Sequence, residues 1–218
     1  MEITWLGHSC FRLRVDELSL ITDPFPDSIG IRMGNVSAIA VTVSNGHPNH
    51  SYWKGVDGTD KVLEGPGEYE LSGIYVRGIM TPRNESDPLD QRNTAYVVEM
   101  EGLSVCHLGD IKHPLTARQA DQLKPVDILF LPVGSGESTL ELSQTIQLMH
   151  TLSPKLIFPM HYNLPGLQSE LGDLEPFVKE MALQDVQTIP KMNVTASSLP
   201  AEPRVVILQA QGVQTEAQ

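Results

Sequence analysis

The sequence is poor in basic residues, and it lacks both long hydrophobic runs and any segment that resembles an interdomain linker. It contains 15 lysine and arginine residues against 27 aspartate and glutamate residues, which gives a formal net charge of −12. Nucleic acids and anionic membranes are bound through basic patches, so the charge argues against both classes of partner. No run of about 18 apolar residues occurs, so no transmembrane helix is expected.

Cysteine is also scarce. Cys10 and Cys106 are the two cysteines of the chain, and their spacing does not demand a disulfide. Two buried free thiols in a reducing compartment are therefore expected. The first six residues have neither the basic segment nor the long apolar segment of a secretory signal peptide. We therefore expect a cytoplasmic protein.

The pattern of apolar residues predicts one α/β domain over residues 1–210, followed by a polar tail over residues 211–218. The first half reads mainly as strands, and the second half alternates helices with strands, which favours two sheets with helices outside them. Strands are expected at 3–6, 10–15, 18–21, 38–43, 61–63, 69–71, 74–76, 94–100, 103–107, 126–131, 156–159 and 205–208. Helices are expected at 115–123 with Thr116 as N-cap, at 138–152 with Ser138 and Glu141 as a capping box, and at 174–182.

Several polar side chains with metal-binding chemistry follow predicted strands. His47 and His50 come after the strand that ends near Val43, His161 follows another strand, and Asp110 lies in the turn after the strand over 103–107. Three histidines and a carboxylate suit zinc, iron or manganese. Spacing alone leaves a second interpretation open, because histidines near strand ends are often surface or hydrogen-bonded residues.

A set of short motifs makes the pattern more specific. They resemble the metallo-β-lactamase superfamily, and within it the branch of ascorbate-phosphate lactonase-like metal-dependent hydrolases. This resemblance implies an αββα sandwich with a two-metal site at one edge of the sheets. The motifs are Trp5-Leu6-Gly7-His8-Ser9-Cys10-Phe11, Ile21-Thr22-Asp23-Pro24-Phe25, Gly65-Pro66-Gly67-Glu68-Tyr69, Asn93-Thr94-Ala95-Tyr96, His107-Leu108-Gly109-Asp110 and Pro159-Met160-His161-Tyr162.

The chain departs from the metal motif that the resemblance implies. The family motif is H-x-H-x-D-H, and the matching stretch here is Asn45-Gly46-His47-Pro48-Asn49-His50, so asparagine stands at two ligand positions. A further family histidine falls between this motif and the Gly-Asp turn, where the chain has no histidine. The best register places Arg83 at that position.

These losses affect the two metal positions unequally. The first position keeps His47 and Asp110, whereas the second keeps His50, Asp110 and His161. The resemblance therefore implies one divalent ion, zinc, manganese or iron, or none. Arg83 is expected either to pair with Asp110 in place of the first metal, since a guanidinium cannot bind a cation, or to point into solvent.

Asp110, Asn49 and His8 are the residues expected at the reaction centre. Asn49 cannot accept a proton as the family aspartate does. His8 is expected either to contact substrate or to make a structural hydrogen bond, and Asp23 either to orient a ligand or to cap a turn.

Two functions follow from this pattern. The first is a weakened hydrolase that acts on a small ester, lactone or phosphoester with at most one metal. The alternative is a catalytically inactive, metal-free binding or structural module. The small-molecule ligand stays unidentified, and an oligomer stays open.

Overall fold

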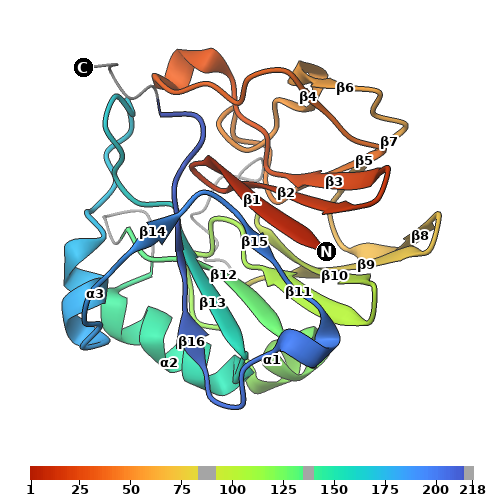
Figure 1. Ribbon diagram of the computed structural model, residues 1–218. Helices are drawn as coiled ribbons and strands as arrows, with labels where there is room; N and C mark the ends of the chain where they lie inside the picture. The colour runs from red at the N-terminus through yellow and green to blue at the C-terminus, as the bar shows by residue number, and fades with distance from the viewer. Residues whose placement is uncertain (83–91, 135–139, 214–218) are drawn as a thin grey trace.

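Two β-sheets face each other in the computed structural model, which describes residues 1–82, 92–134 and 140–213 (Figure 1). The first sheet has the strand order β15-β1-β2-β3-β5-β7, and the second has the order β16-β13-β12-β11-β10-β9-β8. Strands of the first sheet are β1 (Glu2–Gly7), β2 (Cys10–Val15), β3 (Leu18–Thr22), β5 (Ala40–Val43), β7 (Lys61–Glu64) and β15 (Met192–Asn193). Those of the second are β8 (Gly67–Leu71), β9 (Ile74–Met80), β10 (Thr94–Met100), β11 (Leu103–His107), β12 (Ile128–Pro132), β13 (Leu156–Met160) and β16 (Arg204–Val205).

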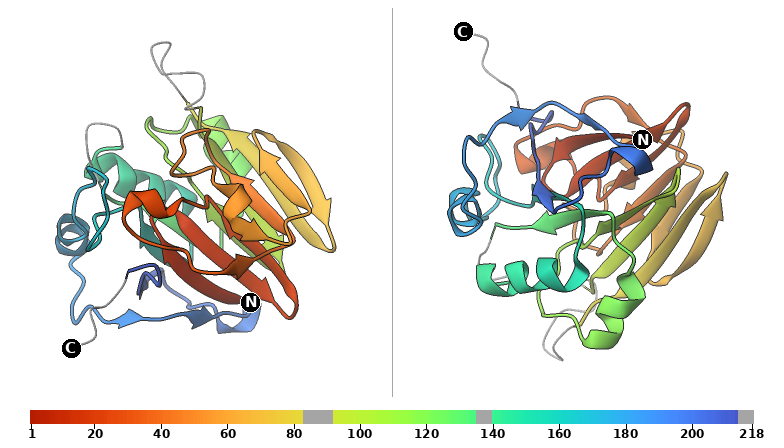
Figure 2. Two further views of the ribbon diagram at one scale, coloured as in Figure 1. Left: turned by 90° about the horizontal axis from the view of Figure 1, so that it is seen from above. Right: turned by 60° about the horizontal axis from the view of Figure 1, so that its bottom comes forward.

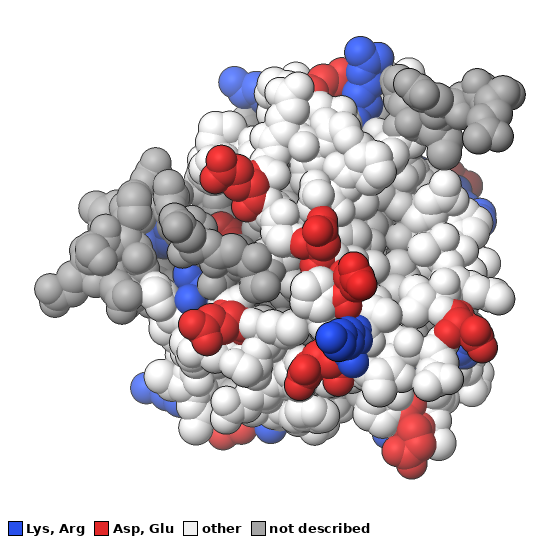
Figure 3. Space-filling model, turned by 90° about the vertical axis from the view of Figure 1, so that its left-hand side faces the viewer, with Lys and Arg blue, Asp and Glu red and all other residues white. Residues whose placement is uncertain are grey.

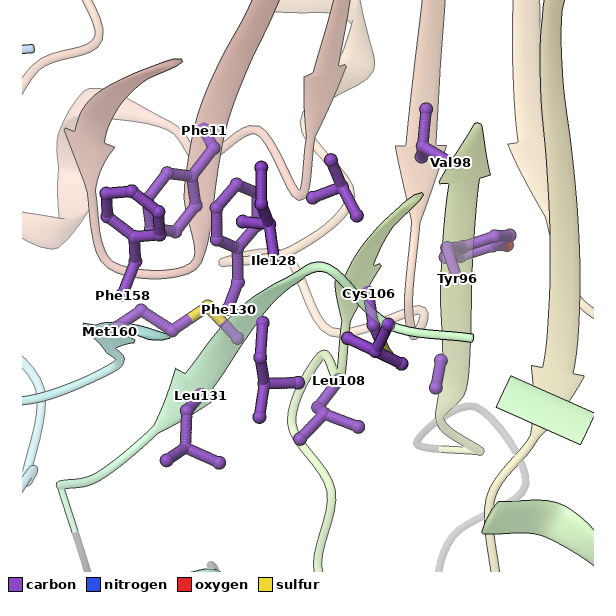
Figure 4. Packing of buried hydrophobic residues seen from close by; sticks show 14 of the residues in the cluster. Phe11, Tyr96, Val98, Cys106, Leu108, Ile128, Phe130, Leu131, Phe158 and Met160 are labelled. Atoms are coloured by element: carbon purple, nitrogen blue, oxygen red, sulfur yellow. The ribbon is translucent and has the colours of Figure 1, made fainter. Parts of the chain in front are cut away.

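The main core lies between the two sheets. Alternate residues of β1 and β2, such as Trp5 and Phe11, point toward the second sheet, as the two-residue period of a strand requires. The ring of Phe11 stacks on Phe130 of β12 with centroids 3.8 Å apart, and Phe130 in turn contacts Phe158 of β13 edge-on (Figure 4). The aromatic contacts fix the distance between the sheets and therefore the relative position of their edges.

The outer faces of the two sheets are covered differently. Helices α1 (Ala117–Leu123) and α2 (Leu142–Leu152) pack on the second sheet, on the side away from the first (Figures 1 and 2). The first sheet buries its outer residues under the segment that follows β3, which includes Phe25 and the 3-10 turn Asp27–Ile29. Shorter elements complete the chain, namely α3 (Glu175–Glu180), β4 (Val36–Ser37), β6 (Val56–Asp57), β14 (Thr188–Ile189) and β17 (Ile207–Leu208).

Two expectations about individual elements were wrong. Helix α2 begins at Leu142 rather than near Ser138, and Ser138 lies outside the described residues. The N-cap is Glu141, and its N–H donates to the side chain of Gln144. The capping pair is therefore Glu141 and Gln144 instead of Ser138 and Glu141, with the same spacing of three residues. The predicted strand over 205–208 is broken, because Val205 pairs with Ile157 of the large sheet whereas β17 pairs with β14.

The end of the chain returns to the first sheet. The N–H groups of Gln211 and Gly212 donate to the carbonyls of Trp5 and Leu6, which places residues 209–213 along β1. The predicted polar tail is thus attached over its first three residues, and residues 214–218 lie outside the described part of the chain. No described helix is long and apolar enough to cross a membrane.

Candidate metal centre

The candidate site lies where strands of both sheets end. Strands β1 and β3 are each antiparallel to β2, and β3 is parallel to β5, so all three end at the same edge of the first sheet. Strands β11 and β13 are both parallel to β12 and end together in the second sheet. Loops at such an edge collect polar side chains on a rigid base. The residues that directly follow these strands, or lie in the next loop, are His8, Asp23, His50, Asp110 and His161.

Three of these side chains form a buried histidine cluster, which consists of His8, His50 and His161. They are 1%, 2% and 4% exposed. The ring of His8 lies 4.7 Å from that of His50 and 4.6 Å from that of His161, centroid to centroid. One ligand atom from each residue can be chosen so that all three lie within 4.8 Å of one another. The first and second sheets thus contribute to one group of imidazoles.

The backbone at the cluster is held in an unusual conformation. His8 and His161 have φ angles of 50° and 54°, in the left-handed region that residues other than glycine adopt rarely, asparagine, aspartate and histidine most often among them. The N–H of His161 donates to the carbonyl of His8 over 3.0 Å, so the two loops support each other across the sheets. Conformations of this kind cost about 1–3 kcal/mol and concentrate at functional sites.

Asp23 fixes the orientation of His50. Its carboxylate is fully buried and accepts hydrogen bonds from Nδ1 of His50, over 2.8 Å, and from both the N–H and the hydroxyl of Ser44. The carboxylate can only accept in this bond, so Nδ1 of His50 carries a proton, and in the neutral imidazole Nε2 is left with the lone pair that a metal needs. Asp23 thus orients the imidazole of His50, and whether that imidazole is a metal ligand stays a prediction.

The histidines of the cluster differ in protonation. Burial lowers the pKa of His161 to about 4, and burial together with the neighbouring histidines holds the pKa of His8 well below its usual value. Burial also lowers the pKa of His50, but the hydrogen bond and charge of Asp23 outweigh it and raise the pKa overall. His8 and His161 are therefore neutral near pH 7, which is the form that binds metals.

Asp110 lies beside the cluster but outside it. The side-chain oxygen of Asn93 accepts from the N–H of Asp110 over 2.9 Å, and Gly109, with φ of 63°, allows the close turn. A side chain at Gly109 would collide with Asn93 and Ser44. The charge of Asp110 acts on both His50 and His161, and its Oδ1 is buried with no hydrogen-bond partner among the described residues.

Side chains of the loop that matches the family motif make hydrogen bonds within that loop. Oδ1 of Asn45 accepts from the N–H of His47 over 2.9 Å, in the manner of a turn. His47 is exposed, its Nδ1 accepts from the N–H of Asn49, and its ring centroid lies 6.3 Å from that of His50. Asn49 is half-buried. Neither His47 nor Asp110 belongs to the described group of ligand atoms within 4.8 Å.

The residues present fit a divalent ion at the cluster. Nδ1 of His8 and Nδ1 of His161 are buried without a hydrogen-bond partner among the described residues, and an unsatisfied buried polar atom usually indicates a missing ligand or water. Neutral imidazoles are favoured ligands for zinc, iron and other transition metals. The cluster can thus supply up to three nitrogen ligands.

Sequence reasoning placed some of these residues correctly and overlooked others. His50 and His161 lie together as expected, and His8, for which substrate contact or a structural hydrogen bond was expected, lies with them. Ser44 and Asn93 support Asp23 and Asp110. Asn93 opens one of the motifs of the family resemblance, but no role was expected for its side chain, and none was expected for Ser44. The hypothesis about Arg83 lies outside the described residues.

Comparisons with known proteins agree with this arrangement. A model of the beta-lactamase superfamily domain matches residues 2–161. A UPF0173 protein of Pyrococcus furiosus is 30% identical over 88% of this chain and 95% of its own length. A UPF0173 metal-dependent hydrolase of Carboxydothermus hydrogenoformans is 23% identical over 80% of this chain and 91% of its own length. A structure from Thermotoga maritima, assigned to the metallo-beta-lactamase superfamily, is 31% identical with a TM-score of 0.76, and the match covers 95% of this chain and 98% of that one. The chain therefore belongs to the metallo-β-lactamase superfamily and, within it, to a family of metal-dependent hydrolases.

Proposed function

We propose that this protein is a hydrolase-like member of its family that holds at most one divalent ion and acts slowly on a small ester, lactone or phosphoester. The observation that supports this proposal most directly is the buried cluster at the edge of the two sheets, in which His50 and His161 stand at family ligand positions. Both are held by surrounding hydrogen bonds, His50 through Asp23 and His161 through its backbone. A preorganised site of this kind is a candidate for catalysis rather than for packing alone.

The surroundings of the motif loop support one ion rather than two. The side chain of Asn45 is used within its own turn, and an amide at Asn49 is at best a weak, uncharged ligand. His47 is exposed, and its Nδ1 accepts from the N–H of Asn49 within its own loop. A second ion would therefore have few anionic or imidazole ligands, and the two-metal arrangement that holds a water from both sides is not available.

The residues of the site provide some of the groups that hydrolysis needs, but not all of them. A divalent ion at the cluster would polarise a carbonyl or phosphoryl oxygen and make water more acidic. Asp110 has a buried oxygen, Oδ1, without a described partner, so it can accept a proton or a hydrogen bond in the site. Asn49 cannot take up a proton, so hydrolysis is expected to be slow.

A second candidate function is a metal-free module that binds a small molecule. The motif loop favours this function. Asn45 and Asn49 stand where the family has a histidine and an aspartate as metal ligands, yet the loop keeps its own hydrogen bonds. A nucleic-acid partner is not proposed. The net charge is −12, and Figure 3 shows a face on which aspartate and glutamate side chains are scattered with few basic ones between them.

Metal content gives the first test. The full-length protein, treated with a chelator and then offered zinc, manganese and iron separately, is expected to retain about one equivalent of one of them, measured by mass spectrometry. His161→Ala removes a buried imidazole and is expected to abolish retention. His47→Ala is expected to keep it, and the exposed His150→Ala serves as an unrelated control.

The outcomes separate the two candidate functions. Two equivalents would show that the proposed limit of one ion is wrong. If no metal is retained, the hydrolase proposal fails and the metal-free module remains. If one equivalent is retained, the loaded protein can be screened against aryl esters, lactones and phosphoesters, with His161→Ala as the blank.

A further inference from the structure

We infer that His8 is a metal ligand, and that this chain holds a single ion by the three imidazoles of His8, His50 and His161. The inference rests on the proposed function only in that an ion binds at this edge of the sheets. His8 then acts as a ligand in place of the family aspartate, whose position is occupied by Asn49 here. Asp110 is then not a ligand and lies beside the three histidines.

The side chain of His8 has no other evident purpose. It is 1% exposed, and its Nδ1 is buried without a hydrogen-bond partner among the described residues. Burial of an unpaired polar atom costs about 1–3 kcal/mol, so a chain gains nothing by keeping a histidine there for packing alone. The nearest ring neighbours are two further histidines and the edge of Phe25.

Among the described residues, the hydrogen bonds of His8 are made by its backbone carbonyl. The carbonyl of His8 accepts from Nε1 of Trp5 over 3.1 Å and from the N–H of His161. Any residue that tolerates a φ of 50° would supply the same carbonyl, and glycine would do so with less strain. A structural role therefore does not explain why the side chain is an imidazole.

The geometry suits a single ion with an open position. Zinc–nitrogen bonds of about 2.0 Å in a tetrahedral site place neighbouring nitrogens about 3.3 Å apart. The three ligand atoms already lie within 4.8 Å of one another, so binding would draw the rings together by at most about 1.5 Å. Three histidines that leave the fourth position open are a donor set used by catalytic zinc sites.

The placement of Asp110 follows from the same geometry. It lies outside the group of three ligand atoms, yet its charge acts on His50 and His161. Oδ2 of Asp110 ion-pairs with Lys112 over 3.8 Å, so with His8 as the third ligand it is Oδ1 that is left to accept a hydrogen bond from water or substrate. The site thus replaces an anionic ligand by a neutral one and keeps one carboxylate available.

The test compares zinc affinity and cobalt spectra of four full-length proteins: the wild type, His8→Asn, His8→Asp and His150→Asn. Asparagine and aspartate both tolerate the left-handed backbone at position 8, but only aspartate offers a good ligand. Zinc is titrated in competition with a chelator of known affinity. We expect His8→Asn to bind zinc at least about 100-fold more weakly than the wild type, His8→Asp to lie between them, and His150→Asn to match the wild type.

The visible absorption of bound cobalt gives a second readout, because it depends on the number and type of donor atoms. A changed spectrum in His8→Asp is expected, and an unchanged one overturns the inference even if His8→Asn fails to fold. Wild-type affinity in His8→Asn also overturns it, while the proposed single-metal site stands. If the wild type binds neither metal, both this inference and the proposed metal site fail.

Discussion

Replacing Asp23 by alanine is expected to lower the free energy of unfolding by about 3–5 kcal/mol and to abolish metal retention. The carboxylate is fully buried and accepts from the N–H and hydroxyl of Ser44 and from Nδ1 of His50. Alanine would leave all three donors buried without an acceptor. The loss of stability is measured by urea unfolding of the metal-free protein followed by circular dichroism.

The effect on metal binding has a separate cause, the tautomer of His50. With Asp23 present, Nδ1 of His50 carries the proton and Nε2 keeps its lone pair. In Asp23→Asn the amide nitrogen can face Nδ1 instead, which favours the tautomer that has its proton on Nε2. We therefore expect Asp23→Asn to lose less stability than Asp23→Ala while still binding metal at least about 10-fold more weakly than the wild type.

Asp16 provides a matched control for the backbone. Asp16 and Asp23 have φ angles of 49° and 39°, but Asp16 is exposed. Asp16→Ala carries the same left-handed strain without any buried donor, so it is expected to cost about 1 kcal/mol. If Asp23→Ala is no more destabilising than Asp16→Ala, the proposed importance of this hydrogen-bond network is wrong.

The sequence predicted the strands around the site well because each has a clear pattern and a clear end. Residues 10–15 alternate, residues 103–107 form a hairpin with the preceding strand through Glu101-Gly102, and both are found as expected. His50 and His161 each follow a predicted strand, so they were expected in loops at one edge of the sheets. The family resemblance, rather than the spacing of histidines, made that expectation specific.

The composition of the cluster was harder to predict, because it depends on contacts between distant segments. The approach of His8 to His161 requires a left-handed residue in each loop and a hydrogen bond between residues 153 positions apart. Nothing in the local sequence indicates either feature. The break at Val206 is similar, because the residues around it are uniformly apolar and give no sign of where the strand ends. Pairing with β13 before Val206 and with β14 after it determines the break.

The metal-free protein is expected to lose stability steeply as the pH falls below 6.5. Burial lowers the pKa of His8, His107 and His161, that of His161 from 6.5 to about 4. Between these values the unfolded chain takes up a proton at His161 that the folded chain does not, so unfolding is favoured progressively as the pH falls. His161 alone accounts for about 3 kcal/mol by pH 4, and the other two add to it.

His50 acts in the opposite direction, because its pKa is raised by Asp23. Its stabilising contribution is fully present below pH 6.5 and is lost as the pH rises through the folded value, so it adds a constant amount below pH 6.5 and leaves the acid dependence there to the other histidines. The measurement is urea unfolding with a chelator present, from about pH 7.5 to about pH 4.5. His161→Asn tolerates the left-handed backbone and does not titrate, so its stability should fall less with pH than that of the wild type, whereas exposed His150→Asn should keep the full dependence. Equal pH dependence in the wild type and His161→Asn would show that His161 does not stay neutral in the folded protein. The acid sensitivity therefore reports directly on whether His161 stays unprotonated in the folded protein, which is the state in which an imidazole can bind an ion.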